Sequence, residues 1–204
     1  MTNYLHKGDL PSEVEIRDSV AIDTETLGLN NQRDKLCLVQ LSTGDGNAHI
    51  IQLDRSNYSA PNLVRIFEEE KILKIFHFAR FDVSVIKRYL GCNTNSVYCT
   101  KISSKLVRTY TDSHGLKDLC SELLGKKISK TQQSSDWGAA ELSKEQISYA
   151  AYDVLYLHAL KEKLDIMLER EGRKNLAQNC FNFIQTRSDL DLAGWPEIDI
   201  FAHK

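Results

Sequence analysis

The chain has 204 residues, of which 26 are basic and 28 are acidic, so its formal net charge is −2. Apolar residues make up 42% and charged residues 26%, a balance typical of a globular domain that excludes collagen-like and disordered chains. This length predicts one domain over 1–204, with a core at about 10–185 and a tail at 186–204.

The first part of the chain predicts a small β-meander followed by a helix. Apolar segments at 19–23, 36–42 and 48–53 predict three strands, and the last two are joined by the turn sequence TGDGN. Their short connections indicate antiparallel pairing. A helix is then predicted from Pro61 to Glu70, because proline is tolerated in the first helical turn.

The rest of the chain predicts a parallel strand pair and then helices. A strand at 72–77, a helix at 78–90 ended by Gly91, and a strand at 96–99 indicate a right-handed crossover. Further helices are predicted at about 100–110, 115–124, 144–170 and 173–184, with Ser143 and Gln146 as a capping box. Residues 186–204 are expected to be irregular. The fold class is therefore α/β, with a mixed sheet covered by helices.

The sequence also indicates where the chain works. Its 5 cysteines form no CxxC pattern and favour a reducing compartment, hence a cytoplasmic location. Charged side chains are frequent in the first twenty residues, so no secretion signal is expected. No apolar run approaches the length of about 18 residues that a membrane span needs, so no membrane contact is expected. The low net charge excludes a polybasic protein, and a nucleic-acid partner has to be short or meet a local basic patch.

Two carboxylates lie close together at the end of the first predicted strand. Asp23 and Glu25 are two residues apart, so both side chains point to the same side of an extended chain. Adjacent carboxylates repel each other, and a divalent cation such as Mg²⁺ or Mn²⁺ offsets that repulsion. Such a pair is also common as solvated acids in a loop, so a metal site requires further ligands.

Further acids lie in the predicted helices. Asp82 stands in the otherwise apolar first half of the helix at 78–90, where a surface acid is the alternative interpretation. Tyr149 and Asp153 are four residues apart in the long helix at 144–170, so they share one face. A carboxylate on such an apolar helix requires a partner or a metal ion, and a surface Tyr–Asp pair is the alternative.

The order of these fragments, DTE on a strand, a mid-chain Asp and YAAYD on a late helix, resembles the DEDD exonuclease superfamily in its tyrosine-containing, ribonuclease D-like branch. The segments KTQQSSDW (130–137) and LSKEQISYAAYDVLYL (142–157) are similar to the ribonuclease D signature. The resemblance covers about 10–185 and implies a ribonuclease H-like mixed β-sheet flanked by helices. The compact chain, with DTETLGL and the ending GWPEIDIFAHK, looks most like the nano-RNase C family, which degrades very short RNAs.

This resemblance implies a role for each acid. The four acids Asp23, Glu25, Asp82 and Asp153 match metal ligands for two divalent ions, Mg²⁺ or Mn²⁺, that clamp the attacking and leaving oxygens of a phosphoryl displacement. Asp23 is expected to bridge both ions. Glu25 and Asp153 are expected to hold the ion that carries the attacking water, and Asp82 to support the other ion. Tyr149 matches the branch tyrosine and is expected to orient the water, because a phenol with a pKa of about 10 is a poor base.

The resemblance also implies substrate contacts. Leu29 lies six residues past Asp23, where short-RNA exonucleases of this superfamily have a leucine that wedges between terminal bases. A buried loop leucine is the alternative. Thr26, directly after the two acids, is expected to contact substrate as well. His77 is expected near the metal ions or, alternatively, in the core at a strand end, and Phe78 follows where many relatives have Asn.

Basic residues are candidates for phosphate contacts. Lys101, Lys105 and Arg108 fall at i, i+4 and i+7 of a predicted helix, which places them on one face. This face either contacts phosphates or is merely solvated. His114, in the turn-like sequence TDSHG, is expected beside that face, as a contact to a 5′-phosphate or as an ordinary loop histidine.

We therefore expect a metal-dependent 3′–5′ exoribonuclease that hydrolyses short oligoribonucleotides, dinucleotides in particular, to nucleoside 5′-monophosphates. The alternatives are ribonuclease D-like trimming of tRNA 3′ ends, a DNA exonuclease, and a nucleic-acid-binding module without catalysis. The expected partner is short RNA, with DNA as the alternative. The resemblance also implies a ring-shaped homo-oligomer, an octamer. The segment WPEIDIF near the end of the sequence is apolar enough to pack on a neighbour.

Overall fold

A computed structural model describes residues 2–128, 132 and 134–203 of the chain. Their centre is a six-stranded sheet in the order β1-β4-β3-β2-β5-β6. The strands are β1 (Asn3–Lys7), β2 (Ser19–Thr26), β3 (Leu36–Ser42), β4 (Ala48–Gln52), β5 (Leu73–Phe76) and β6 (Val97–Cys99). β2 pairs antiparallel with β3 and parallel with β5, so strand direction changes at β2 in the middle of the sheet.

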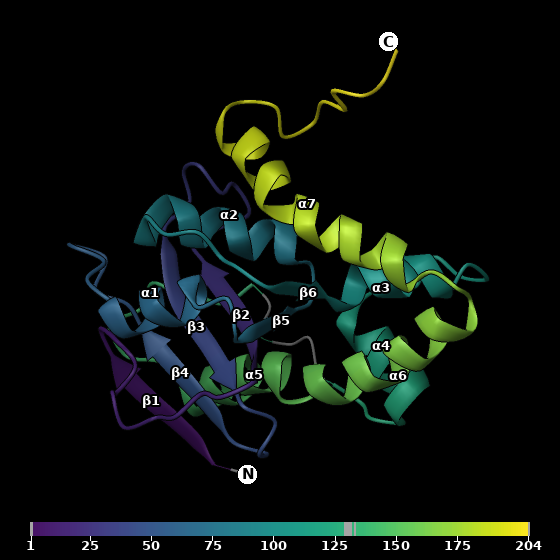
Figure 1. The fold of residues 1–204 in the computed structure, drawn as a ribbon. Coiled ribbons are helices and arrows are strands. Elements are labelled where there is room, and N and C mark those ends of the chain that lie inside the picture. Colours follow the sequence, from purple (N-terminus) through teal and green to yellow (C-terminus); the bar gives the residue numbers. More distant parts are fainter. Residues whose placement is uncertain (1, 129–131, 133, 204) are drawn as a thin grey trace.

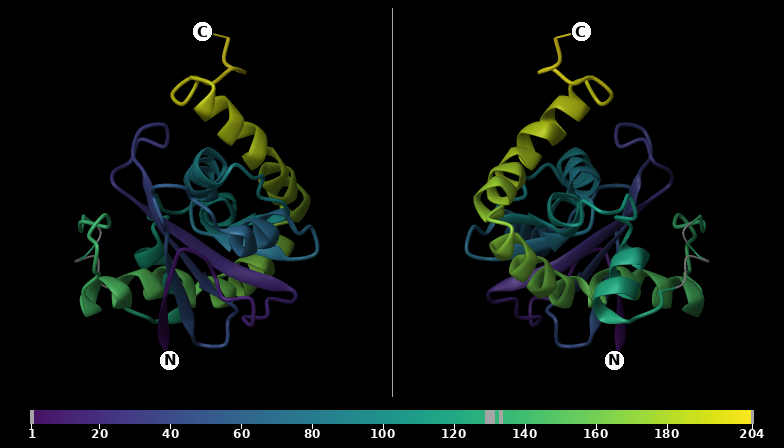
Figure 2. Two further views of the ribbon diagram at one scale, coloured as in Figure 1. Left: turned by 90° about the vertical axis from the view of Figure 1, so that its left-hand side faces the viewer. Right: turned by 90° about the vertical axis from the view of Figure 1, so that its right-hand side faces the viewer.

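Seven helices cover this sheet in the described part of the chain. They are α1 (Pro61–Glu68), α2 (Ala79–Leu90), α3 (Thr100–Val107), α4 (Leu116–Leu124), α5 (Lys144–Leu155), α6 (Leu157–Arg170) and α7 (Lys174–Leu192). α5 packs across β2, β3 and β4, and α7 packs on α2 and β6. Figure 1 shows α2 and α7 on one side of the sheet and α5 on the other, and the side views of Figure 2 agree.

The hydrophobic core lies between these layers because both faces of the central strands are covered. Every residue of β3 is buried, as expected for a strand with helices on both faces. Asp23 of β2 lies opposite Gln40 of β3, which is itself fully buried. The central strands therefore fix the position of the β2 carboxylates firmly.

The α/β class and the mixed sheet predicted from the sequence are confirmed. The meander β2-β3-β4 is antiparallel and β5-α2-β6 forms a parallel pair. Pro61 begins α1, Gly91 ends α2 in the left-handed conformation, and the capping box of Ser143 with Gln146 begins α5.

One strand was missed and two predictions about elements were wrong. β1, which pairs parallel with β4 at the sheet edge, was not predicted, because its alternation of polar and partly exposed residues resembles a loop. The helix predicted over 144–170 is divided at Tyr156, whose backbone angles of −104° and −4° separate α5 from α6. α7 continues to Leu192, so the first part of the predicted irregular tail is helical.

Each helix in the described residues is too short or too polar to cross a membrane. Part of the signature segment at 130–137 lies outside the described residues, namely 130, 131 and 133.

Candidate active site

A pocket of about 660 Å³ opens where the end of β2, the start of α2, the start of α3 and the middle of α5 meet. It lies at the carboxyl ends of β2 and β5, the usual place for a ligand in an open α/β sheet. The acids Asp23, Glu25, Asp82 and Asp153 all line it. The sequence placed these acids in three separate elements, and the fold brings them to one cavity.

Three of the acids form a compact cluster. Asp23 and Glu25 extend from β2 and Asp153 extends from α5, and each offers a carboxylate oxygen within 4.8 Å of the other two. All three are partly buried. Three carboxylates this close together repel one another strongly unless protons or cations neutralise them.

Asp82 lies beside this cluster, in the first turn of α2. It is only 3% exposed, and its Oδ1 accepts a hydrogen bond of 2.7 Å from the hydroxyl of Thr24. Because Thr24 stands between Asp23 and Glu25 on β2, this bond joins α2 to the acidic strand. The position of Asp82 is thus tied to that of the cluster.

The environment favours the neutral forms of these acids when no cation is present. Burial raises the pKa of Asp23 to about 7. Burial and then the charge of Asp23 raise the pKa values of Glu25, Asp82 and Asp153 well above the ordinary carboxyl range. Hard oxygen ligands that are crowded and poorly solvated fit Mg²⁺ or Mn²⁺, whose charge replaces the missing solvation.

Tyr149 lies one helical turn before Asp153 and lines the same pocket. Burial, and then the charge of Asp153, raises the pKa of its phenol, so the hydroxyl is neutral at any ordinary pH. Its ring packs against Trp137, with centroids 5.9 Å apart. Trp137 is itself only 2% exposed, so the tyrosine ring packs against a buried aromatic side chain.

The predicted substrate contacts are only partly gathered at the pocket. Leu29 lines it and is 91% exposed, which excludes the alternative of a buried loop leucine. Thr26 lines it too, and its hydroxyl donates to the carbonyl of Gly28 in the same loop. A Cβ at Gly28 would lie 2.3 Å from a carboxylate oxygen of Asp34, so a larger residue there would require the Asp34 side chain to move.

His77, directly after β5, and Lys101, at the start of α3, also line the pocket. The Nδ1 atom of His77 is 2.9 Å from the hydroxyl of Thr100. Burial and then the nearby Lys101 lower the pKa of His77 to about 3, so this ring is neutral. Both His77 and Lys101 line the pocket, so Lys101 is a cation available to a bound phosphate.

The predicted basic face is wrong for Arg108. α3 ends at Val107, and Arg108 has non-helical angles of −103° and 59°, which turn it away from the row of Lys101 and Lys105. Its side chain is fully buried, donates to Ser104 over 3.0 Å, and pairs with Glu122. Arg108 therefore holds the end of α3 in place and does not face the pocket.

Lys105 and His114 are not lining residues of the pocket either. Lys105 is an exposed residue of α3. The Nδ1 atom of His114 lies 2.8 Å from the hydroxyl of Ser104, the same hydroxyl that Arg108 contacts. Within this chain His114 belongs to the structure that supports α3. Phe78 and Lys117 line the pocket without having been predicted as site residues.

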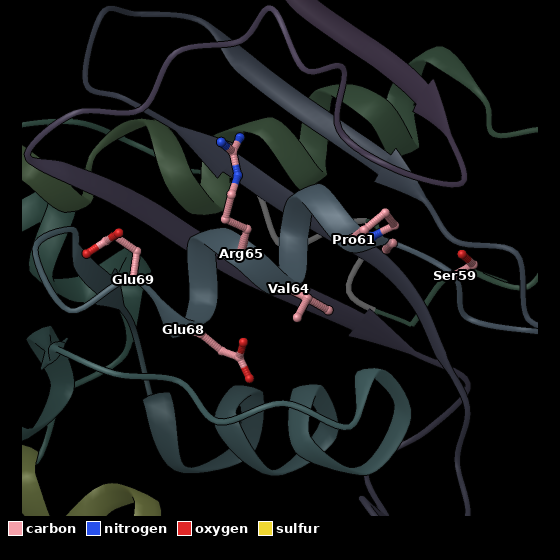
Figure 3. Close-up of a pocket in the computed structure, with 7 residues that line it drawn as sticks. Ser59, Pro61, Val64, Arg65, Glu68 and Glu69 are labelled. Carbon is pink, nitrogen blue, oxygen red and sulfur yellow. The ribbon is translucent and has the colours of Figure 1, made fainter.

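A second hollow of about 610 Å³ runs along α1. Its charged side chains Arg65, Glu68 and Glu69 point in different directions and do not converge (Figure 3). This hollow therefore offers no convergent set of ligands among its described lining residues, in contrast to the acidic pocket.

Comparison with known proteins agrees with this geometry. The family model described as "3'-5' exonuclease" matches residues 7–169. The chain therefore belongs to the 3′–5′ exonuclease family, and the predicted resemblance to ribonuclease D-like exonucleases is confirmed. The acidic pocket lies at the carboxyl ends of β2 and β5, within the matched region.

Several solved structures are similar over the whole chain. NrnC from Brucella melitensis, determined with bound Mg²⁺, is 56% identical, with a TM-score of 0.96 and 100% coverage of both chains. The same Brucella protein has also been determined bound to pGG.

The chain also matches ribonucleases D, but over only part of their length. Ribonuclease D of Acidiphilium cryptum is 32% identical over 76% of this chain, and that of Gluconacetobacter diazotrophicus is 34% identical over the same share. The matched region spans only 39% of each of these ribonucleases D.

Proposed function

We propose that this chain is a metal-dependent 3′–5′ exoribonuclease that hydrolyses short oligoribonucleotides, dinucleotides in particular, to nucleoside 5′-monophosphates. The observation that carries the proposal is the cluster of Asp23, Glu25 and Asp153, whose oxygens lie within 4.8 Å of one another inside a substrate-sized pocket. The similarity to NrnC, determined with Mg²⁺ and with pGG, supports both the metal and the short substrate.

Two divalent ions fit the donor set of this pocket. Asp23, Glu25 and Asp153 would hold one ion, and Asp82 together with Asp23 would support the second. When bound, such ions neutralise phosphate charge and make a coordinated water acidic enough to attack. The raised pKa values of the four acids agree with this, because bound cations would stabilise their charged forms.

The protein's own groups then orient the reaction. The neutral phenol of Tyr149 is a hydrogen-bond donor and acceptor next to Asp153, suited to aligning a water for in-line attack. Thr24 holds Asp82 by a hydrogen bond of 2.7 Å, which fixes the fourth acid without using a ligand from the cluster. Lys101 supplies positive charge to a phosphate in the pocket.

The shape and charge of the site favour a short substrate. A volume of about 660 Å³ falls in the range of sites for small ligands, roughly 300–1,000 Å³. A long nucleic-acid strand binds tightly when many of its phosphates meet basic side chains. This chain offers few at the site, because Arg108, one of the three predicted cations, is buried and paired. The exposed Leu29 offers an apolar contact for a base instead.

A length series tests this function. Labelled RNAs of two, three, five, ten and twenty nucleotides are incubated with the protein and Mg²⁺, with EDTA as the control. We expect kcat/KM to be greatest for two nucleotides and to vanish in EDTA. Values that rise steadily with length favour tRNA-type trimming, equal or faster cleavage of DNA favours a DNA exonuclease, and no cleavage of any substrate favours a binding module.

We also propose that the protein is a homo-oligomer, an octamer. The segment that follows α7 exposes apolar side chains, with Trp195 at 44% and Phe201 at 76% exposure. Figure 2 shows this segment extending away from the sheet and its helices, where a second copy can reach it. Light scattering after size-exclusion chromatography tests the proposal, and a monomer mass at micromolar concentration would contradict it.

A further inference from the structure

Phe78, which lines the acidic pocket, has a backbone conformation that phenylalanine rarely adopts. Its φ of 76° and ψ of 45° lie in the left-handed region, where glycine and asparagine are much better tolerated. It is also the N-cap of α2, a position at which its side chain makes no capping hydrogen bond. An aromatic residue is therefore unfavourable here on two local grounds.

The strained backbone holds the ring at the pocket and not in the core. The side chain is 43% exposed, whereas its neighbours Phe76 and Ala79 are fully buried. Strained residues persist where the surrounding structure enforces them and often serve a function at a binding site. Burial in the core is thus not what compensates for the unfavourable conformation of Phe78.

Lys101 completes a mixed surface with this ring. Its Nζ lies 4.3 Å from the centroid of the Phe78 ring, a cation–π contact. Both residues line the pocket that contains Asp23 and Asp153. An aromatic surface next to a cation matches the two parts of a nucleotide, because bases stack on aromatic rings and phosphates bind ammonium groups.

We propose that Phe78 is a substrate-binding residue that stacks on a base of the substrate, with Lys101 held over the ring for the adjacent phosphate. The inference rests on the proposed nuclease function, because it places a nucleotide in this pocket. It does not depend on substrate length or on RNA rather than DNA.

The variant Phe78→Asn separates this role from a packing role. Asparagine tolerates the left-handed conformation and can cap α2, so Tm should stay at or above that of the wild type. Loss of one base stack should raise KM for a dinucleotide by about five- to a hundredfold while kcat changes little. Phe78→Tyr keeps the ring and is the matched control, with KM close to that of the wild type.

A substrate without bases tests whether the ring meets a base. The effect of Phe78→Asn on KM should disappear for a dinucleotide whose two bases are absent. It should persist in the Lys101→Met background, because the stack does not act through the lysine. The proposal is overturned if the abasic substrate shows the same loss, or if Lys101→Met abolishes the effect of Phe78→Asn.

Binding without turnover keeps this test independent of the proposed reaction. Affinities for guanosine 5′-monophosphate and for ribose 5-phosphate are measured by calorimetry in the presence of Mg²⁺. We expect Phe78→Asn to weaken the nucleotide and leave the sugar phosphate unchanged. The stacking role is contradicted if the wild type and Phe78→Asn bind the nucleotide equally, or if neither binds it. Failure of the proposed function has a different sign, because the wild type then does not cleave RNA.

Discussion

The side-chain amide of Gln32 donates to the backbone carbonyl of Asp191 over 2.9 Å, and so joins the loop that carries Leu29 to the carboxyl end of α7. The carboxylate of Asp191 accepts a bidentate salt bridge from Arg80 of α2, at 2.7 and 2.8 Å, and also pairs with Arg187. The Leu29 loop and the helix that carries Asp82 are thus fastened to the same point of α7.

Removing this connection should loosen the loop without disturbing the acids. We expect Gln32→Ala to raise KM for a dinucleotide by about two- to tenfold, the range of one neutral hydrogen bond, with kcat nearly unchanged. If the effect acts through Leu29, it should shrink in a Leu29→Ala background, because coupled residues are not additive. Gln178→Ala, which loses a surface hydrogen bond on α7, is the control and should behave as the wild type.

The acids of the cluster should be essential for turnover and dispensable for folding. Asp153→Asn and Asp23→Asn each replace a charged ligand by a neutral one of the same shape, and should reduce kcat by about a hundredfold or more. Circular dichroism should show an intact fold, since the change relieves charge repulsion. Asp112→Asn, at an exposed position, is the matched control. A folded cluster variant with near-normal hydrolysis would refute the metal site.

Tyr149→Phe should retain the fold and lose the reaction rate. The ring still packs against Trp137 at the observed spacing, so Tm should be unchanged. Loss of a positioning hydroxyl should reduce kcat by about 10²–10⁴, with little change in the Mg²⁺ concentration required. Tyr152→Phe on the same helix is the control. An unchanged kcat in Tyr149→Phe would remove the tyrosine from the mechanism.

Divalent ions should stabilise the folded protein. Mg²⁺ binds the cluster of Asp23, Glu25 and Asp153 only in the folded state, so a hundredfold excess over its Kd should add about 2.7 kcal/mol of stability. Thermal unfolding with Mg²⁺, with EDTA and with KCl at equal ionic strength measures this gain. Asp23→Asn should lose most of it. The same rise in Tm with KCl alone would show a general salt effect.

A histidine pair at the sheet edge should make β1 sensitive to acid. The Nε2 atom of His6 lies 3.0 Å from the Nδ1 atom of His49 on β4, and their rings are stacked. Burial lowers the pKa of both histidines, and the charge of His6 lowers the pKa of His49 further. The negative charges of Glu13, near His6, and Asp45, near His49, oppose these shifts in part. Because the folded pKa values lie below the unfolded value of about 6.5, stability is lost as pH falls from about 6.5 through the folded values.

Hydrogen exchange measures this effect locally. At about pH 5 the protection of the β1 amides, normalised for intrinsic exchange, should fall relative to about pH 7.5, while the amides of β3 remain protected. The double variant His6→Phe with His49→Phe keeps two aromatic rings and should reduce the difference. Equal acid sensitivity of β1 in this variant would exclude the histidine pair as its cause.

Much of the fold was predictable because the central elements carry strong local signals. β3 is apolar throughout, the capping box of Ser143 begins α5, and Gly91 ends α2. β1 lacks such a signal, since its stability depends on pairing with β4, more than forty residues further along the chain. The break between α5 and α6 at Tyr156 also lacks a local signal, because the residues on both sides of it are good helix formers.

The candidate site followed a similar rule. Asp23, Glu25, Asp82 and Asp153 were predictable together, because the order of the motifs identifies them even though each alone is ordinary. Their roles stay predictions that the variants above test. Arg108 could not be placed, because helical spacing holds only inside the helix and α3 ends one residue earlier. The left-handed backbone of Phe78 is likewise a property of the folded chain that its local sequence does not specify.

The direction change at β2 has a consequence for how the site is assembled during folding. The antiparallel meander β2-β3-β4 has short connections, so Asp23 and Glu25 can be in place early, when loop closure costs little entropy. Asp153 arrives only when α5, far along the chain, docks across the same three strands. A chain that is still being synthesised therefore carries two of the clustered carboxylates without the third, and its catalytic centre is completed only after most of the chain has been made.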